Sequence, residues 1–171
     1  MGVDPGSRIT GYGVVEERDG NLQATAFGVI TPRRDSPIEQ RLLHVYSDLA
    51  AIIGTHKPDT VAIEDPYVGK NPRAIFALGQ AQAVVLLACA QLGLPVFRYA
   101  PAQIKQAVAD YGAATKEQVA DMVRLTLRLP DADIPEDATD ALAVALCHLH
   151  QIRAQDILGR AIGTERSEVQ L

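Results

Sequence analysis

The turn Asp19-Gly20-Asn21 constrains the fold of this chain more than any other stretch. β-rich runs at 11–17 and 23–30 flank it, and an Asp-Gly pair between two such runs is among the strongest hairpin signals in a sequence. The short apolar run that ends at Asp4 adds a third strand, so the beginning of the chain predicts an antiparallel meander. Only three residues precede Asp4, against about five or six in an ordinary strand, and we therefore expect residues to be missing from the N-terminus.

A helix and a fourth strand follow the meander. The run Ser36-Pro37-Ile38-Glu39 predicts a helix start, with Ser36 as the cap and Glu39 completing a capping box. Apolar residues then recur at 38, 42, 45, 49 and 52, on one face of a helix that ends at Gly54. The β-rich run 60–64 predicts a strand whose last residue is a carboxylate, Glu64.

The remaining elements complete an α/β pattern. A helix is predicted over 71–92; it is apolar on nearly all sides from Ala83 on, and we expect it to be buried. The other predicted elements are a strand over 95–99, a helix over 101–109, a helix from the Thr115 capping box to Leu129, and a last helix from Pro135. This order predicts an α/β fold in which helices flank a mixed five-stranded sheet. Residues 1–154 are expected to form one domain, and the polar residues 155–171 a flexible tail.

Composition restricts the class of protein. A chain of 171 residues with 47% apolar and 22% charged residues is typical of a single globular domain. The longest apolar run, Ala83 to Ala90, is too short to cross a bilayer, and no signal peptide opens the chain, so a cytoplasmic protein without membrane contact is expected. Cys89 and Cys147 lie in apolar helical patterns and are expected to be buried thiols. The net charge of −5 argues against a nucleic-acid partner held by charge alone.

Four carboxylates are placed where they can meet. Asp4 and Glu64 each end a predicted strand, and Asp137 and Asp140 lie three residues apart on one helix, so both point from the same face. Each also has a plainer interpretation, because Asp4 can cap the Pro5-Gly6 turn and the helical acids can complement the helix dipole. If the four converge, cations must neutralise them or their pKa values must rise. Oxygen ligands suit Mg²⁺ or Mn²⁺, and two such ions about 4 Å apart are a standard device for hydrolysing a phosphodiester.

Basic residues and histidines give weaker signals. Lys70, Arg73, Lys105 and Lys116 lie in loops or near helix starts, where solvated surface is the plainer interpretation. Lys116 begins a helix and would suit a phosphate, because its ammonium and the helix N-terminal amides act together. His148 and His150 face different ways on a helix, which disfavours a metal pair. No nucleotide-binding glycine fingerprint occurs in the sequence.

Several short motifs occur in the order and spacing of a known family. They are Gly2-Val3-Asp4-Pro5-Gly6-Ser7, Thr10-Gly11-Tyr12-Gly13-Val14, Ala62-Ile63-Glu64, Lys70-Asn71, Leu78-Gly79-Gln80-Ala81 and Asp137-Ala138-Thr139-Asp140-Ala141-Leu142-Ala143. Over residues 1–150 the chain resembles the RuvC family of Holliday-junction resolvases. Lys105 and Lys116 fit basic positions of that family.

The resemblance implies a ribonuclease-H-like fold and a homodimeric, Mg²⁺-dependent endonuclease that makes paired nicks in four-way DNA junctions. It implies that Asp4, Glu64, Asp137 and Asp140 are catalytic acids that bind two Mg²⁺ (or Mn²⁺) ions, with Asp4 bridging them. One ion would activate water and the other would stabilise the leaving 3′-oxygen, which yields a 5′-phosphate and a 3′-hydroxyl.

DNA contacts and partners are implied in the same way. Tyr67 would stack on an unpaired base near the junction centre, Lys105 and Lys116 would hold phosphates, and Arg8, Lys70 and Arg73 would add to a basic face. The branch-migration proteins RuvA and RuvB are implied partners, and we expect the helix over 71–92 to form the dimer interface.

Two alternatives stay open. One is a catalytically silent protein that only binds junctions, which the presence of all four acids disfavours. The other is the actin-like sugar kinase and ATPase group, whose phosphate loop also follows an early strand; that fold needs a second similar half, for which 171 residues leave no room.

Overall fold

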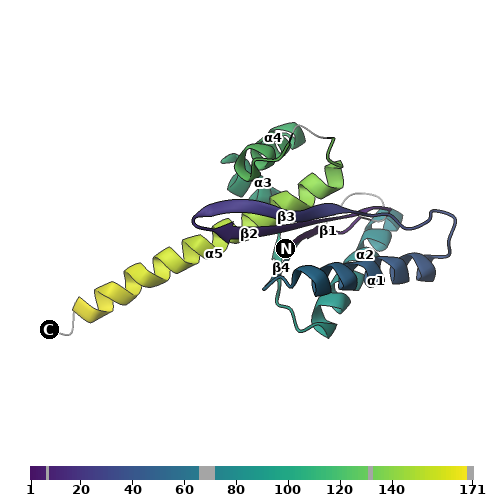
Figure 1. Cartoon of the computed structure of the whole chain (residues 1–171), viewed down its shortest axis with the longest axis horizontal. Helices are drawn as coiled ribbons and strands as arrows, with labels where there is room; N and C mark the ends of the chain where they lie inside the picture. Colours follow the sequence, from purple (N-terminus) through teal and green to yellow (C-terminus); the bar gives the residue numbers. More distant parts are fainter. Residues whose placement is uncertain (7, 66–71, 131–132, 169–171) are drawn as a thin grey trace.

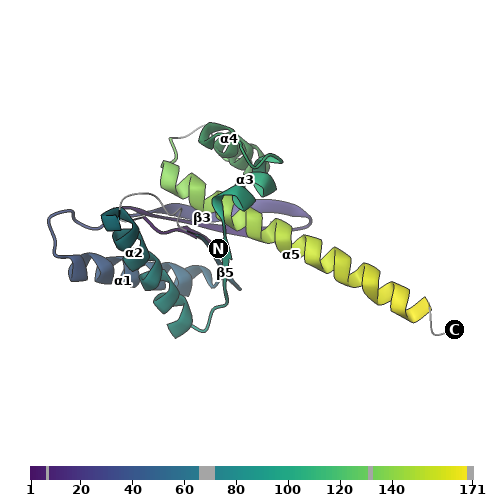
Figure 2. The same ribbon diagram turned by 180° about the vertical axis from the view of Figure 1, so that it is seen from behind.

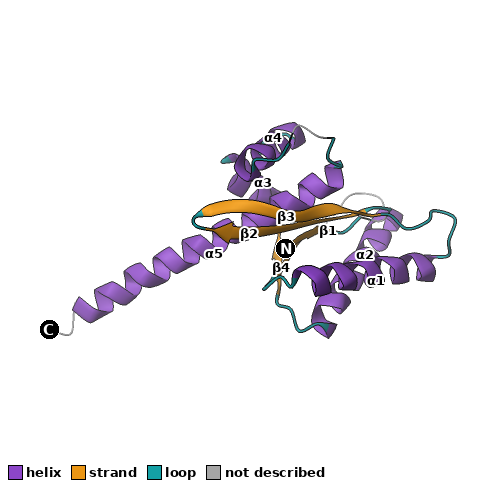
Figure 3. Cartoon of the chain, in the orientation of Figure 1, coloured by secondary structure: helices purple, strands orange, loops and turns teal. Residues whose placement is uncertain are grey.

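A mixed five-stranded sheet forms the centre of the molecule, as the sequence predicted (Figure 3). The computed structural model describes residues 1–6, 8–65, 72–130 and 133–168, with side chains as far as residue 158. In the order β3-β2-β1-β4-β5, the strands are β3 (Asn21–Ile30), β2 (Thr10–Arg18), β1 (Gly2–Asp4), β4 (Val61–Glu64) and β5 (Val96–Tyr99). The pairs β1–β2 and β2–β3 are antiparallel, whereas β1–β4 and β4–β5 are parallel.

The predicted hairpin is confirmed in detail. Arg18 pairs with Asn21 across a two-residue turn in which both Asp19 (φ 51°) and Gly20 (φ 77°) have positive φ. Positive φ at both central residues matches the right-handed twist of the flanking strands, and aspartate and glycine tolerate this conformation best. The turn therefore fixes the register of β2 on β3, and the register of β2 on β1 sets the position of Asp4 opposite Gly11.

Helices cover both faces of the sheet (Figures 1 and 2). One face carries α1 (Ile38–His56) and α2 (Pro72–Gln91); the other carries α3 (Pro101–Ala109), α4 (Lys116–Leu127) and the long α5 (Glu136–Glu168). Alternate strand residues serve the two cores: Val14 and Ile63 belong to the α1/α2 core, and Val15 and Ala62 to the core under α5. This period of two is what a sheet buried on both faces requires.

The two predicted capping boxes have different outcomes. At α4, Thr115 Oγ1 accepts from the Gln118 amide at 3.3 Å and Gln118 Oε1 accepts from the Thr115 amide at 2.9 Å, so that prediction is confirmed. At α1 the prediction is wrong, because Pro37 is the N-cap residue and its carbonyl accepts from the amides of Gln40 and Arg41. The helix starts one residue later than the Ser36 pattern requires.

The last helix extends further than predicted. Residues 155–168, expected to be part of a loose tail, continue α5 to Glu168 and project away from the sheet (Figure 1). No proline follows Pro135, and alanine, glutamine, arginine and glutamate in this stretch are good helix formers. A helical segment without an apolar stripe is stable only when it continues a helix that is packed against the protein. Here the buried part of α5 around Leu142 and Leu146 provides that packing.

The expectation that α2 is buried all round is wrong. Its buried residues, among them Ala81, Val85 and Ala88, lie on one face, whereas Phe76 and Leu87 are 70% and 60% exposed. Among the described helices α2 is the one long and apolar enough to span a membrane, which is weak evidence because core helices of water-soluble proteins pass the same test. Here α2 packs on α1 and leaves an apolar stripe uncovered.

Glycines let α5 lie directly on the sheet, and this close approach predicts a large effect of adding one methyl group. A Cβ at Gly11 would lie 1.8 Å from the backbone oxygen of Asp137, and one at Gly2 would lie 2.1 Å from that of Ala141. Because backbone must move, we expect Gly11→Ala to lower the free energy of unfolding by about 1–3 kcal/mol in urea titrations. Gly54→Ala, where a Cβ meets no atom within 4 Å, is the matched control and should be neutral or slightly stabilising. Equal stability of Gly11→Ala and wild type would contradict the close packing.

Candidate active site

Two carboxylates lie side by side at the carboxyl edge of the sheet. β1 and β4 are parallel neighbours in which Val3 pairs with Ile63, so the next residues, Asp4 and Glu64, end adjacent strands. The expectation that these two strands are neighbours is thus confirmed. This edge of an α/β sheet is where ligands commonly bind.

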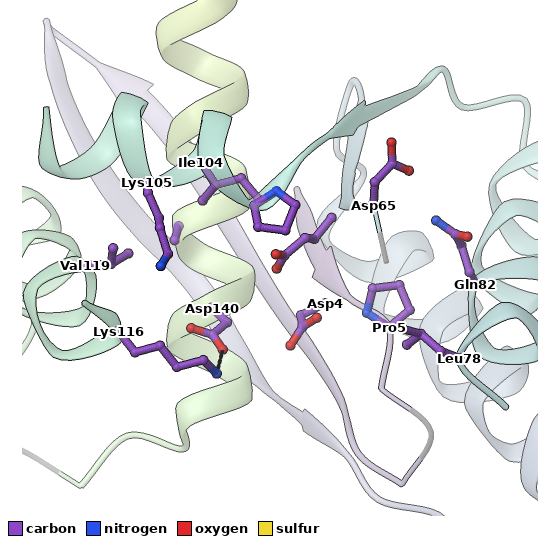
Figure 4. Close-up of a pocket in the computed structure, with 13 residues that line it drawn as sticks. Asp4, Pro5, Asp65, Leu78, Gln82, Ile104, Lys105, Lys116, Val119 and Asp140 are labelled. Carbon is purple, nitrogen blue, oxygen red and sulfur yellow. Dashed lines mark hydrogen bonds and ion pairs between the residues drawn. The ribbon is translucent and has the colours of Figure 1, made fainter. Parts of the chain in front are cut away.

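Asp140 reaches the same place from α5. With Asp4 and Glu64 it lines a cavity of about 240 Å³, whose walls come from α2 on one side and from α3 and α4 on the other (Figure 4). Asp137 lies one turn earlier on α5 and is not among the described residues that line the cavity. Its charge still raises the pKa values of Asp4 and Asp140. The structure therefore gathers three of the four predicted acids around one cavity and places the fourth within electrostatic reach.

The electrostatics show an excess of negative charge. Burial, followed by the charges of Glu64, Asp140 and Asp137, raises the pKa of Asp4 from 3.8 to about 7. Burial also raises the pKa of Glu64, with Asp140 adding to the effect, and burial raises the pKa of Asp140. Such a cluster either holds protons near neutral pH or gains stability from bound cations.

Two lysines project from the α3/α4 wall. Lys116 Nζ donates to Glu136 Oε1 at 2.8 Å and to Asp140 Oδ2 at 3.2 Å, and its hydrogen bond to Glu136 is the main cause of its raised pKa. Lys105 lines the same cavity, and its charge, like that of Lys116, opposes the rise in the pKa of Glu64. Both predicted phosphate-binding lysines are thus at the carboxylates.

The donor set suits a hard divalent cation. Asp4, Glu64 and Asp140 offer only carboxylate oxygens, the ligands that Mg²⁺ and Mn²⁺ prefer. Burial is the main cause of their raised pKa values, and the charges of neighbouring carboxylates raise these values further. Among the described residues, no group of three or more Asp, Glu, His or Cys side chains is arranged so that it could hold one metal ion. The Lys116 ammonium contacts one Asp140 oxygen. The chemistry of the residues fits such an ion, and cation binding would draw together carboxylates that now repel one another.

Two other predicted DNA contacts, Arg73 and Arg8, are not part of the cavity lining. Arg73, in the first turn of α2, and Arg8, after β1, are exposed and are not among the described residues lining the cavity. Tyr67 and Lys70 lie outside the described residues. Their proposed roles stay predictions.

Three features at or near the site were missed from the sequence. Asp65, to which no role was assigned, accepts a hydrogen bond from Arg98 Nε at 2.6 Å. Gln82 lines the cavity from α2. The only sequence signal for Gln82 is a polar residue on the otherwise apolar face of that helix.

The third is His148, which ties α5 to the strands. His148 is only 2% exposed. Its ring forms hydrogen bonds with Thr60 Oγ1 at 2.9 Å and with Tyr99 Oη at 2.8 Å, and it packs on Phe97. Burial lowers the pKa of His148 to about 4, so the ring is neutral at physiological pH. These bonds hold the helix that carries Asp140 against β5 and the beginning of β4, the strand that ends at Glu64.

Comparisons of the sequence with known proteins give one consistent match. The family model for crossover junction endodeoxyribonuclease RuvC matches residues 1–148. Crossover junction endodeoxyribonuclease RuvC of Dehalococcoides mccartyi is 47% identical over 154 residues, covering 90% of this chain and 93% of that protein. The protein of the same name from Roseiflexus is 48% identical over 150 residues, covering 88% and 89% of the two chains.

A solved structure extends the likeness to three dimensions. The structure described as T. thermophilus RuvC in complex with Holliday junction substrate superposes with a TM-score of 0.85 at 33% identity, covering 90% of this chain and 94% of that one. The likeness therefore covers most of the fold.

Proposed function

Because the chain belongs to the RuvC family of crossover junction endodeoxyribonucleases, we propose that it resolves four-way (Holliday) DNA junctions by paired, symmetric nicks during recombination and repair. The observation that carries this proposal is the convergence of Asp4, Glu64 and Asp140 on one cavity beside two lysines. The similar Thermus protein was solved with a Holliday junction as its substrate, which supports the same substrate here.

The residues divide into ligands and phosphate contacts. Asp4 is the central carboxylate, with Glu64, Asp140 and Asp137 around it, and the set would hold two Mg²⁺ (or Mn²⁺) ions. Bound ions would supply Lewis-acid activation of water and of the leaving oxygen. Lys105 and Lys116 would bind phosphate oxygens of the cleaved strand, and Lys116 would exchange its Asp140 contact for the phosphate. Hydrolysis then leaves a 5′-phosphate and a 3′-hydroxyl.

One assay tests the proposed function. The protein is incubated with a synthetic four-way junction and with a linear duplex of matched sequence, with and without Mg²⁺ or Mn²⁺. Symmetric nicks in the junction alone, dependent on metal, are expected. Tight junction binding without cleavage in either metal would favour the silent binding protein instead, and ATP hydrolysis without junction affinity would favour the kinase-like alternative.

The uncovered stripe of α2 supports a homodimer. Phe76, Ala83 and Leu87 are exposed at positions i, i+7 and i+11, which lie on one face of a helix. An apolar stripe of this kind marks an interaction surface. A two-fold dimer would present two identical sites to the two equivalent strands of a junction. We therefore propose that α2 forms the interface, as expected from the sequence.

A single charge in this stripe should separate the subunits. Leu87→Glu would bury carboxylates against the partner, and the expected result is a shift of sedimentation mass from dimer to monomer at micromolar concentration. Leu125→Glu, at a leucine 72% exposed on α4, makes the same change away from the stripe and should leave the mass unchanged. A dimer that survives Leu87→Glu would place the interface elsewhere.

Family membership alone supports the proposed partnership with RuvA and RuvB. The proposed cytoplasmic location follows from the proposed DNA substrate. The acidic net charge of −5 means that junction affinity depends on the local lysines and should fall steeply as salt is raised.

A further inference from the structure

The two walls of the cavity differ in chemistry (Figure 4). The α3/α4 wall carries Lys105 and Lys116, which suit phosphate oxygens. The opposite side, formed by α2 and the chain after β1 and β4, carries Leu78, Pro5, Gln82 and Asp65. Among the described α2 residues that line the cavity, Gln82 is polar and Leu78 is apolar, so the α2 surface suits a mostly apolar group with one polar edge.

Gln82 is buried without a partner for its amide. The residue is 8% exposed, and its Nε2 is fully buried with no hydrogen-bond partner among the described residues. In Figure 4 the side chain extends from α2 toward Asp65, and both residues line the cavity. The neighbouring Asp65 carboxylate accepts from Arg98 Nε and makes no hydrogen bond with this amide nitrogen.

An unpaired buried donor indicates a missing acceptor. Buried polar groups in native proteins are almost always paired, because leaving one unpaired loses its hydrogen bonds to water. Gln82 lies on the buried face of α2 with Ala81 and Val85, where a methionine would fill similar space without that loss. A ligand that enters the cavity and brings an acceptor would satisfy the amide.

We propose that Gln82 is a specificity-determining residue: the α2 wall receives the nucleoside next to the scissile phosphate, and Gln82 Nε2 donates to an acceptor on its base. This inference rests on the endonuclease function proposed above. With the scissile phosphate at the carboxylates and lysines, the adjacent sugar and base must leave the centre of the cavity toward one wall. Leu78 and Pro5 offer apolar contact to the ring and sugar, while the amide distinguishes a base edge that accepts from one that donates.

The test uses junctions that are identical except for the base on either side of the nick. Wild type should cut them at rates that differ at least about tenfold. Gln82→Met removes the amide and keeps the volume, so the favoured junction should lose about tenfold in rate while the poorest one stays within about twofold. Gln82→Glu replaces the donor by an acceptor and should shift the preference toward bases that present an amino group. Gln80→Met, two residues away on α2 and not among the cavity-lining residues described, is the control and should keep the wild-type ranking.

Each other outcome is informative. An equal loss on all junctions, with the ranking preserved, would show that Gln82 is only structural and would overturn the inference. Wild-type cleavage without any base preference would also overturn it while leaving the endonuclease proposal intact. Failure of wild type to cut every junction would instead overturn the endonuclease proposal itself. Thermal unfolding of each variant shows whether a lost rate reflects lost folding.

Discussion

Asp4→Asn is expected to lower the rate of junction cleavage at least about 1,000-fold while junction affinity stays within about threefold. The substitution keeps the shape of the side chain but removes the charge at the centre of the carboxylate cluster. Losing a divalent-ion ligand removes several kcal/mol of transition-state stabilisation, and about 4 kcal/mol corresponds to this change in rate. Binding depends on the lysine wall, which the substitution leaves in place.

The measurement pairs single-turnover cleavage in Mg²⁺ with junction binding in Ca²⁺ or EDTA. Asp65→Asn is the control, because the Asp65 carboxylate follows Glu64 directly in the chain but accepts a hydrogen bond from Arg98. The cleavage rate of the Asp65→Asn variant should differ from that of wild type by less than about threefold. A comparable loss in both variants would mean that general negative charge, and not a specific ligand, supports cleavage. Cleavage by Asp4→Asn near the wild-type rate would refute the metal-site proposal.

Local signals made much of the fold predictable. The Asp19-Gly20 turn identified the hairpin, and the Thr115 capping box located the start of α4. Each of these depends on backbone chemistry within a few residues, so sequence suffices. The end of α5 was missed because it depends on the buried segment that anchors the helix, and the exposed face of α2 was missed because it depends on what the rest of the molecule leaves uncovered.

The carboxylates of the site could also be predicted from the sequence, but other parts of the site could not. Asp4 and Glu64 could be expected at one edge because each ends a β-rich run, and Asp140 because it borders an apolar helix. The alternative that Asp4 is only a turn residue is disfavoured by its surroundings, because burial and then the charges of Glu64 and Asp140 raise its pKa. Gln82 and the Asp65–Arg98 pair could not be found in this way, since segments distant in the sequence create them.

The cluster also predicts an unusual pH dependence of stability in metal-free protein. The pKa of Asp4 is raised from 3.8 to about 7 on folding, so between about pH 4 and 7 the folded state keeps a proton that the unfolded state releases. The folded state binds more protons in this window, and stability contributed by this group falls as pH rises through it. The raised pKa values of Glu64 and Asp140 act in the same direction.

Comparing wild type with Asp4→Asn isolates this effect. His148, whose pKa is lowered to about 4, destabilises the folded state below about pH 6.5, but it does so equally in both proteins. In urea titrations with EDTA, the variant should be more stable than wild type by about 1–2 kcal/mol at pH 5 and about 2–4 kcal/mol at pH 8. Above about pH 7 the difference should be constant, because Asp4 is then ionised in both states.

Divalent cations should reverse the order of the two proteins. Mg²⁺ binds the folded state and stabilises wild type by an amount that grows with its concentration, whereas the variant lacks the central ligand and should gain little. A variant that is no more stable than wild type at pH 8 in EDTA would show that Asp4 carries no electrostatic cost in the metal-free fold. A Mg²⁺ response equal in both proteins would show that the ion binds away from Asp4. The expected pair of results ties the instability of the empty carboxylate cluster to the cation affinity that cleavage requires.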